Sequence, residues 1–325
     1  MGSAGLGRDG RRARGRVLGV CRTMAARYTD LSVRRATAAI AVVVSVSAVA
    51  GGWVAPPQLA SATPLESYWS FAARPLLADK GGVSLSKSTT AGVPAFWYPD
   101  SSTSSSTDQL LNSPSGAVSF IVANVANGAG SSVDPNYVSA IAAYVRDGVK
   151  VYGYVATDYG SRSLSSVEAE VSDWYSWYGV DGILFDGSSN DPALAGHGSY
   201  YNELYDYVKH MTGPGVLGTT VVLNPGTIPA EAYMRDSDII CDFEGPEASY
   251  VSATFPAWVN SYPATRFWNI IYDSAGVAPM QNDVSLARGR NAGYVFVTTL
   301  SGANPYGGMP SSTLWSAEVS ALTNP

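Results

Sequence analysis

The sequence predicts a (β/α)8 barrel of the TIM type, formed by a single domain that follows an N-terminal signal segment. From residue 93 onward, eight short apolar or β-branched runs alternate with longer segments of helical periodicity. Each run ends in polar residues or glycine, as the strands of a parallel barrel do at the face that carries their loops. A doubly wound open sheet is the alternative, although no Gly-x-Gly-x-x-Gly motif follows the first run.

The first 62 residues have the order of a secretory signal. Arg34 and Arg35 precede an apolar stretch at 36–50, and the small residues 60–62 offer a cleavage site. We therefore expect secretion. An uncleaved signal anchor at the cell surface is the alternative, because the stretch 36–55 is nearly long enough to span a bilayer. Residues 63–90 form a lead-in rich in Ser, Thr and Gly, and residues 91–325 form the barrel domain.

The net charge of the chain indicates which classes of ligand it can bind. Residues 1–62 hold nine of the 20 basic residues and two of the 26 acidic ones, so the remainder carries a net charge of −13. Nucleic acid is therefore an unfavourable partner, and a cationic or neutral ligand suits this field better. Once residues 1–62 are removed, Cys241 is the single cysteine, and we expect it to be a buried thiol. We expect a monomer.

The strands and helices follow in order along the chain. The eight expected strands are 93–98, 118–123, 149–155, 182–185, 219–223, 239–243, 267–272 and 293–298. Mostly apolar runs of this kind fit parallel strands that are covered on both faces. The expected helices are 135–146, a segment that starts with a capping box at Ser165 and Glu168, 200–211, 246–262, 281–291 and 311–322. The Ser/Thr tract at 101–107 is most simply a flexible loop.

Two carboxylates end two of the apolar runs. Asp186 follows the run 182–185, and Glu244 follows the run 239–243. A carboxylate in such a place is costly to bury unless it is paired or used. Two acids at the ends of two strands, in an otherwise weakly charged chain, favour general acid/base chemistry and, in particular, glycoside hydrolysis. Asp186 could instead cap a helix.

Other polar and aromatic side chains gather at the same strand ends. The candidate substrate-binding residues are Asp100, Tyr98, Asn124, Asp158, Tyr159, Arg162, Asn224, Asn269 and Tyr272. Each has a structural alternative. The asparagines could satisfy local backbone, the aromatic rings could belong to the core, and Asp158 could either line the site or hold Arg162. His197 and His210 have no metal-ligand spacing, so we expect neither a metal nor an organic cofactor.

These motifs together resemble the spherulin-4 (spherulation-specific) family. The matching stretches are PAFWYPD at 94–100, FIVANVANGAG at 120–130, GYVATDYGSR at 153–162, GILFD at 182–186, VLNPG at 222–226 and DIICDFE at 238–244. They span almost all of the domain, and the third is the most specific. The resemblance implies a (β/α)8 barrel related to hydrolases of galactosamine-containing polysaccharide and to endo-α-1,4-polygalactosaminidases. It also implies catalytic roles for Asp186 and Glu244.

One departure from the family pattern lies beside Asp186. The family usually has Phe-Asp-Glu at this strand end, and Gly187 replaces the glutamate here. The leading hypothesis is a secreted glycoside hydrolase of an amino-sugar polysaccharide, with Asp186 as nucleophile and Glu244 as acid/base. Because of Gly187, a non-catalytic carbohydrate-binding, cell-surface or spore-associated protein that keeps the groove remains the alternative.

Overall fold

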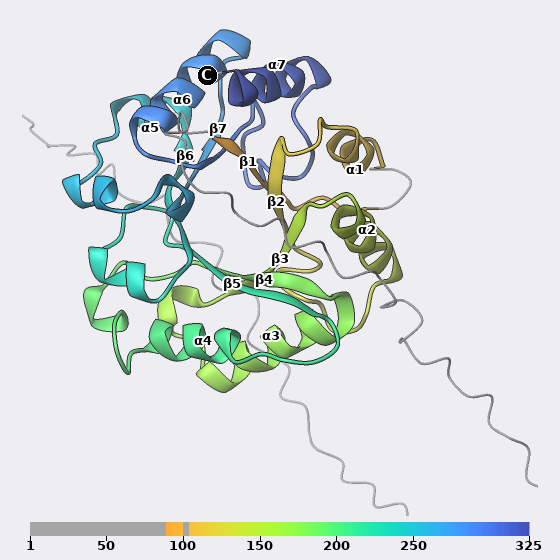
Figure 1. The fold of residues 1–325 in the computed structure, drawn as a ribbon, viewed down its shortest axis with the longest axis vertical. Helices are drawn as coiled ribbons and strands as arrows, with labels where there is room; N and C mark the ends of the chain where they lie inside the picture. The colour runs from red at the N-terminus through yellow and green to blue at the C-terminus, as the bar shows by residue number, and fades with distance from the viewer. Residues whose placement is uncertain (1–88, 100–103, 325) are drawn as a thin grey trace, which may run out of the picture. The chain divides into compact units, whose positions relative to one another are not determined.

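The computed structural model describes residues 89–99 and 104–324, and these form a closed barrel of eight parallel strands (Figure 1). The strands pair in sequence order, and β8 closes on β1. They are β1 (Thr90–Ala95), β2 (Val118–Ala123), β3 (Lys150–Ala156), β4 (Val180–Asp186), β5 (Val216–Asn224), β6 (Ile239–Pro246), β7 (Phe267–Tyr272) and β8 (Tyr294–Val297). The predicted fold class is confirmed.

Helices surround the strands, and one of them follows every strand except β5 (Figure 1). They are α1 (Ser104–Leu111), α2 (Pro135–Arg146), α3 (Leu164–Tyr178), α4 (Tyr200–Lys209), α5 (Glu247–Ser252), α6 (Val277–Gly289) and α7 (Ser312–Thr323). After β5 the chain makes a 3-10 turn at Glu231–Arg235 instead. In the part of the chain described, no helix is both long and apolar enough to cross a membrane.

Aromatic side chains fill the barrel interior below its carboxyl end. The ring of Phe120 lies 4.9 Å from that of Tyr152 and 5.0 Å from that of Trp268, measured between centroids. Side chains two residues apart on a strand share a face, so Tyr154 lies above Tyr152 and faces the barrel mouth. This aromatic layer closes the barrel and leaves the polar strand ends as the floor of a site.

Local sequence explains the accurate boundaries. Helix α2 begins where predicted, because Asp134 accepts hydrogen bonds from the amides of Asn136 and Tyr137 and Pro135 occupies the first turn. Helix α3 begins at Leu164, and its cap is Ser163, which accepts from the amide of Ser166. The capping box predicted at Ser165 and Glu168 is therefore wrong.

Three further predictions about elements are corrected. Part of the Ser/Thr tract expected to be a loop belongs to α1, where Thr107 accepts hydrogen bonds from Trp97 (3.2 Å) and Tyr144 (3.3 Å). The single helix predicted over 246–262 is broken at Pro256 into α5 and a 3-10 turn at Ala257–Ser261. The first strand begins at Thr90, three residues earlier than predicted. Residues 1–62 and the lead-in up to residue 88 lie outside the described part.

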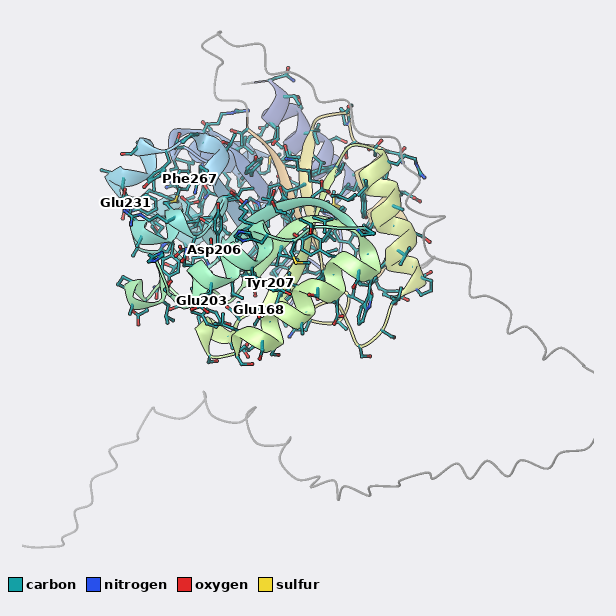
Figure 2. The ribbon with its side chains drawn as sticks, turned by 60° about the horizontal axis from the view of Figure 1, so that its bottom comes forward. Glu168, Glu203, Asp206, Tyr207, Glu231 and Phe267 are labelled. Carbon is teal, nitrogen blue, oxygen red and sulfur yellow. The ribbon has the colours of Figure 1, made fainter. Side chains whose placement is uncertain are left out.

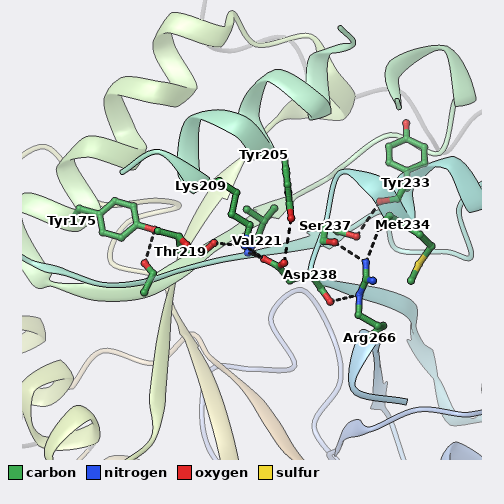
Figure 3. Close-up of polar contacts among 11 residues, drawn as sticks. Tyr175, Tyr205, Lys209, Thr219, Val221, Tyr233, Met234, Ser237, Asp238 and Arg266 are labelled. Carbon is green, nitrogen blue, oxygen red and sulfur yellow. Dashed lines mark hydrogen bonds and ion pairs between the residues drawn. The ribbon is translucent and has the colours of Figure 1, made fainter. Parts of the chain in front are cut away.

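A polar network fastens the amino end of β6 to its neighbours (Figure 3). Asp238 pairs with Lys209 of α4 and accepts from the amide of Val221 at 2.8 Å. Arg266 donates to the carbonyls of Asp238 (2.5 Å), Met234 (2.7 Å) and Ser237 (2.7 Å). These bonds hold the segment that replaces the missing helix, and so they fix where β6 enters the barrel.

Candidate active site

Asp186, Asn224 and Glu244 meet at the carboxyl end of three neighbouring strands. Asp186 ends β4 and pairs in register with Asn224, which ends β5. Glu244 lies on β6, the next strand around the barrel. Consecutive parallel strands end at the same face, which is why three residues far apart in sequence come together.

The Asn224 side chain bridges the two carboxylates. Its amide nitrogen Nδ2 donates to Oδ1 of Asp186 at 2.8 Å and to Oε2 of Glu244 at 2.5 Å. The two carboxylate oxygens therefore lie no further apart than both bonds together, about 5.3 Å. The side-chain oxygen Oδ1 of Asn224 accepts from the backbone amide of Gly226 at 3.0 Å, which fixes the orientation of the side-chain amide group.

Two tyrosines that sequence reasoning missed give each carboxylate a second donor. Tyr154 donates to Oδ2 of Asp186 at 2.7 Å, and Tyr306 donates to Oε1 of Glu244 at 2.7 Å. The ring of Phe96 packs edge-on against both, at centroid distances of 5.4 and 5.6 Å. Tyr154 has a sequence signal, because it lies on a predicted strand three residues before Thr157, the first polar residue at the end of that strand. Tyr306 has none, because it lies in the loop between β8 and α7.

Burial dominates the electrostatics of the pair. It raises the pKa of Asp186, and the hydrogen bonds from Tyr154 and Asn224 partly oppose that rise. Burial also raises the pKa of Glu244, opposed by the bonds from Asn224 and Tyr306 and reinforced by the charge of Asp186. Two nearby carboxyl groups that disfavour each other's ionisation separate into one ionised and one protonated group. Such a pair can supply a nucleophile or base together with an acid.

A cavity of about 510 Å³ opens beside Glu244 and Tyr154, the tyrosine that donates to Asp186. Its lining residues are Phe96, Asn124, Val125, Asn127, Tyr154, Glu244, Tyr272, Gly302, Ala303, Asn304, Pro305 and Tyr306. Asn124 and Tyr272 are therefore placed where the sequence predicted, at the mouth of the barrel. The side-chain oxygen Oδ1 of Asn124 accepts from the backbone amide of Gly128, so its NH2 group remains available to a ligand.

Three of the predicted binding residues are held by other contacts outside this cavity. Asn269 is fully buried between Asp242 and Tyr250, with hydrogen bonds of 2.7 Å to each, so the prediction that it contacts substrate is wrong. It alternates with Trp268 and therefore points out of the barrel. Tyr98 bonds to Asp134 and Asn136 beside α2.

Arg162 is the third. It pairs with Glu170 of α3 at 2.8 Å and donates to the carbonyl of Ala156 at 2.5 Å. The alternative that Asp158 holds Arg162 is therefore wrong. Arg162 and Glu170 border a separate surface groove, which also contains Ser166 and Asp173.

Asp158 and Tyr159 lie in the turn after β3, and both are exposed at the same end of the barrel. Gly187, directly after Asp186, has a positive φ of 53°. Asp100 lies outside the described residues. Cys241 is fully buried, which confirms the expected thiol, and burial raises its pKa well above the usual value. Among residues 89–99 and 104–324, no three His, Cys, Asp or Glu side chains are arranged to hold a metal ion.

The fold and the site define a class: a (β/α)8 barrel with paired, buried carboxyl groups at the carboxyl ends of its strands. Comparison with known proteins gives the family. The profile of spherulation-specific family 4 matches residues 91–322, and the chain belongs to this family. The resemblance inferred from the motifs is confirmed.

Two relatives illustrate the match. Spherulin-4 of Physarum polycephalum is 30% identical over 199 residues, which cover 60% of this chain and 56% of that protein. The chain thus spans little more than half the length of this relative. The crystal structure of Aspergillus clavatus Sph3 in complex with GalNAc superposes with a TM-score of 0.61 at 24% identity. That match covers 73% of this chain and 98% of Sph3, and it shows a shared fold.

Proposed function

We propose that this protein is a secreted glycoside hydrolase that cleaves an amino-sugar polysaccharide. The observation that carries the proposal is the pair Asp186 and Glu244, which one amide of Asn224 joins and of which Glu244 lines an open cavity. Membership of spherulation-specific family 4 supports it. The GalNAc bound to the structurally similar Sph3 supports an amino sugar as substrate.

The separation of the two carboxyl groups favours a retaining mechanism. Retaining glycosidases place them about 5–5.5 Å apart, whereas inverting enzymes separate them by about 6.5–9.5 Å to admit a water molecule. The limit of about 5.3 Å between the two bridged oxygens agrees with the shorter spacing. Glu244 would protonate the glycosidic oxygen while Asp186 attacks the anomeric carbon. Glu244 would then deprotonate the water that releases the sugar from Asp186.

Substitution of each carboxylate tests the proposal. We expect Asp186→Asn and Glu244→Gln each to lower the release of oligosaccharides from galactosamine-containing polymers by about a hundredfold or more. Glu203→Gln, on the exposed face of α4, is the matched control and should keep full activity (Figure 2). Full activity in either carboxylate variant would contradict the assignment.

The anomeric configuration of the first product tests the mechanism separately. We expect NMR spectra recorded during hydrolysis to show that the new reducing end has the configuration of the cleaved bond. An inverted product would mean that the two carboxyl groups move apart when substrate binds, and that Asp186 acts as a base.

A non-catalytic carbohydrate-binding protein is the second candidate. Gly187 favours it, because the residue next to Asp186 supplies no side chain to the site. This candidate predicts that the wild-type protein binds galactosamine-containing polymer in affinity electrophoresis and releases no oligosaccharide from it.

A further inference from the structure

The turn after β3 holds Asp158 in a strained backbone conformation beside the candidate active site. Asp158 and Tyr159 are consecutive non-glycine residues with positive φ, 48° and 57°. Such residues cost free energy that the surroundings must offset, and they cluster at ligand-binding sites. Hydrogen bonds from this turn to the neighbouring strand end stabilise the strained conformation.

The turn is fastened to the backbone of Asp186 and Gly187. The amide of Thr157 donates to the Asp186 carbonyl at 2.9 Å, and the Thr157 hydroxyl donates to the Gly187 carbonyl at 2.9 Å. The amide of Tyr159 donates to the same Gly187 carbonyl at 2.7 Å. Asp158 therefore keeps a fixed position relative to the residue that we assign as nucleophile.

Gly187 leaves the space in front of Asp158 open. A Cβ atom built on Gly187 would meet one neighbour within 4 Å, the amide nitrogen of Asp158 at 3.9 Å. The carboxylate of Asp158 is exposed and forms no hydrogen bond or ion pair with any side chain of the described residues. Arg162, the nearest basic residue in sequence, is occupied by Glu170 and the Ala156 carbonyl. An unpaired, positioned carboxylate at the edge of a ligand site favours a cationic group.

The two sides of the site differ in chemistry. The cavity beside Glu244 contains the neutral amides of Asn124, Asn127 and Asn304. On the side of the β3 turn, Asp158 and Tyr159 are both exposed, Tyr159 by 69%. Burial raises the pKa of Tyr154, and the charges of Asp186, Glu244 and Asp158 add to that rise, so Asp158 lies close enough to act on the hydroxyl that bonds to Asp186. Neutral amides suit the hydroxyl and acetamido groups of an N-acetylated sugar, whereas an exposed carboxylate without a basic partner suits a protonated amine.

We propose that Asp158 is a specificity-determining residue that binds the ammonium group of a deacetylated amino sugar, while the cavity beside Glu244 binds an N-acetylated or neutral sugar. The inference rests on the proposed glycoside hydrolase function. It assigns to this chain a partly deacetylated polymer as its preferred substrate.

The test compares Asp158→Asn with wild type on two galactosamine polymers, one fully N-acetylated and one partly deacetylated. We expect kcat/KM on the deacetylated polymer to fall about threefold to tenfold at low salt and the value on the acetylated polymer to stay unchanged. Asp206→Asn, exposed on α4, makes the same change in net charge away from the site and should alter neither value (Figure 2). Equal losses on both polymers, or no loss on either, would overturn the proposal.

A binding measurement tests the ammonium site independently of the proposed hydrolase activity. If the wild-type protein hydrolyses neither polymer, the hydrolase proposal fails. Affinity electrophoresis with the same polymers then tests whether Asp158 binds an ammonium group. Weaker binding of the deacetylated polymer by Asp158→Asn than by Asp206→Asn would still support the ammonium site. Equal binding by the two variants, or no binding by wild type, would reject it.

Discussion

At the scale of single residues, Asn224 and two tyrosines decide how the carboxyl pair can work. The Asn224 amide stabilises negative charge on Asp186 and Glu244 alike, so it cannot by itself distinguish them. Tyr154 donates to Asp186 and Tyr306 donates to Glu244, so each carboxylate has a donor that can be removed without affecting the other. A hydrogen bond donated to a carboxylate favours its charged form and lowers its pKa.

Removal of each tyrosine hydroxyl should therefore move a different limb of the pH profile. Tyr154→Phe should raise the pKa of Asp186 and shift the acid limb of kcat/KM upward by up to about one pH unit, because the nucleophile must be ionised. Tyr306→Phe should raise the pKa of Glu244 and shift the alkaline limb upward by a similar amount, because the acid must be protonated. Shifts in the opposite limbs would reverse the two roles.

At the scale of elements, no α-helix follows β5, and Arg266 stabilises the loop that takes its place. Its guanidinium donates to three backbone carbonyls that no helix satisfies, those of Met234, Ser237 and Asp238. The segment these bonds hold leads directly into β6, which carries Glu244. The bonds from Arg266 therefore stabilise the fold and also help to position Glu244.

Arg266→Met keeps most of the side-chain volume and removes all the donors. We expect it to lower the free energy of unfolding by about 2–4 kcal/mol, because buried carbonyls lose charged partners. Urea denaturation measures the loss. Arg235→Met, exposed on the neighbouring 3-10 turn, is the control and should change stability by less than about 0.5 kcal/mol. Equal stability of the two variants would show that water replaces the Arg266 bonds.

At the scale of the whole molecule, buried acids lie behind the barrel wall as well as at its mouth. Asp242, Asp283 and Glu318 are all fully buried. Burial raises the pKa of Asp242 and of Glu318 well above the usual range. It raises the pKa of Asp283 to about 7, helped by the charge of Glu247 and opposed by Arg290.

The raised pKa of Asp283 predicts how stability depends on pH. Below about pH 4 the group is protonated in both the folded and the unfolded states and costs nothing. As pH rises towards 7, the unfolded state releases its proton first, so stability falls until pH passes the folded pKa. At pH 8 we expect Asp283→Asn to be more stable than wild type by roughly 2–4 kcal/mol, and at pH 4 to be equal. Thermal unfolding at the two pH values measures this, and a variant less stable at both would contradict it.

Much of the fold and part of the site could be predicted from sequence. Strands β2 and β7 and helix α2 lie at the predicted residues, because apolar periodicity and the residues at helix ends act over short distances. Helix α1 was missed because a Ser/Thr tract has no apolar periodicity, and its order comes from contacts with Trp97 and Tyr144.

The sequence by itself determined that Asp186 and Glu244 follow the fourth and sixth apolar runs of one barrel, two strands apart, because a repeated pattern of strand and helix fixes that order. Tertiary structure decided that one amide of Asn224 joins them, that Tyr306 reaches Glu244 across 62 positions, and that Asn269 points away. It also placed Asp158 beside Gly187, through hydrogen bonds between turns that follow different strands. Distances between side chains depend on barrel closure and loop packing, and no local pattern in the chain encodes them.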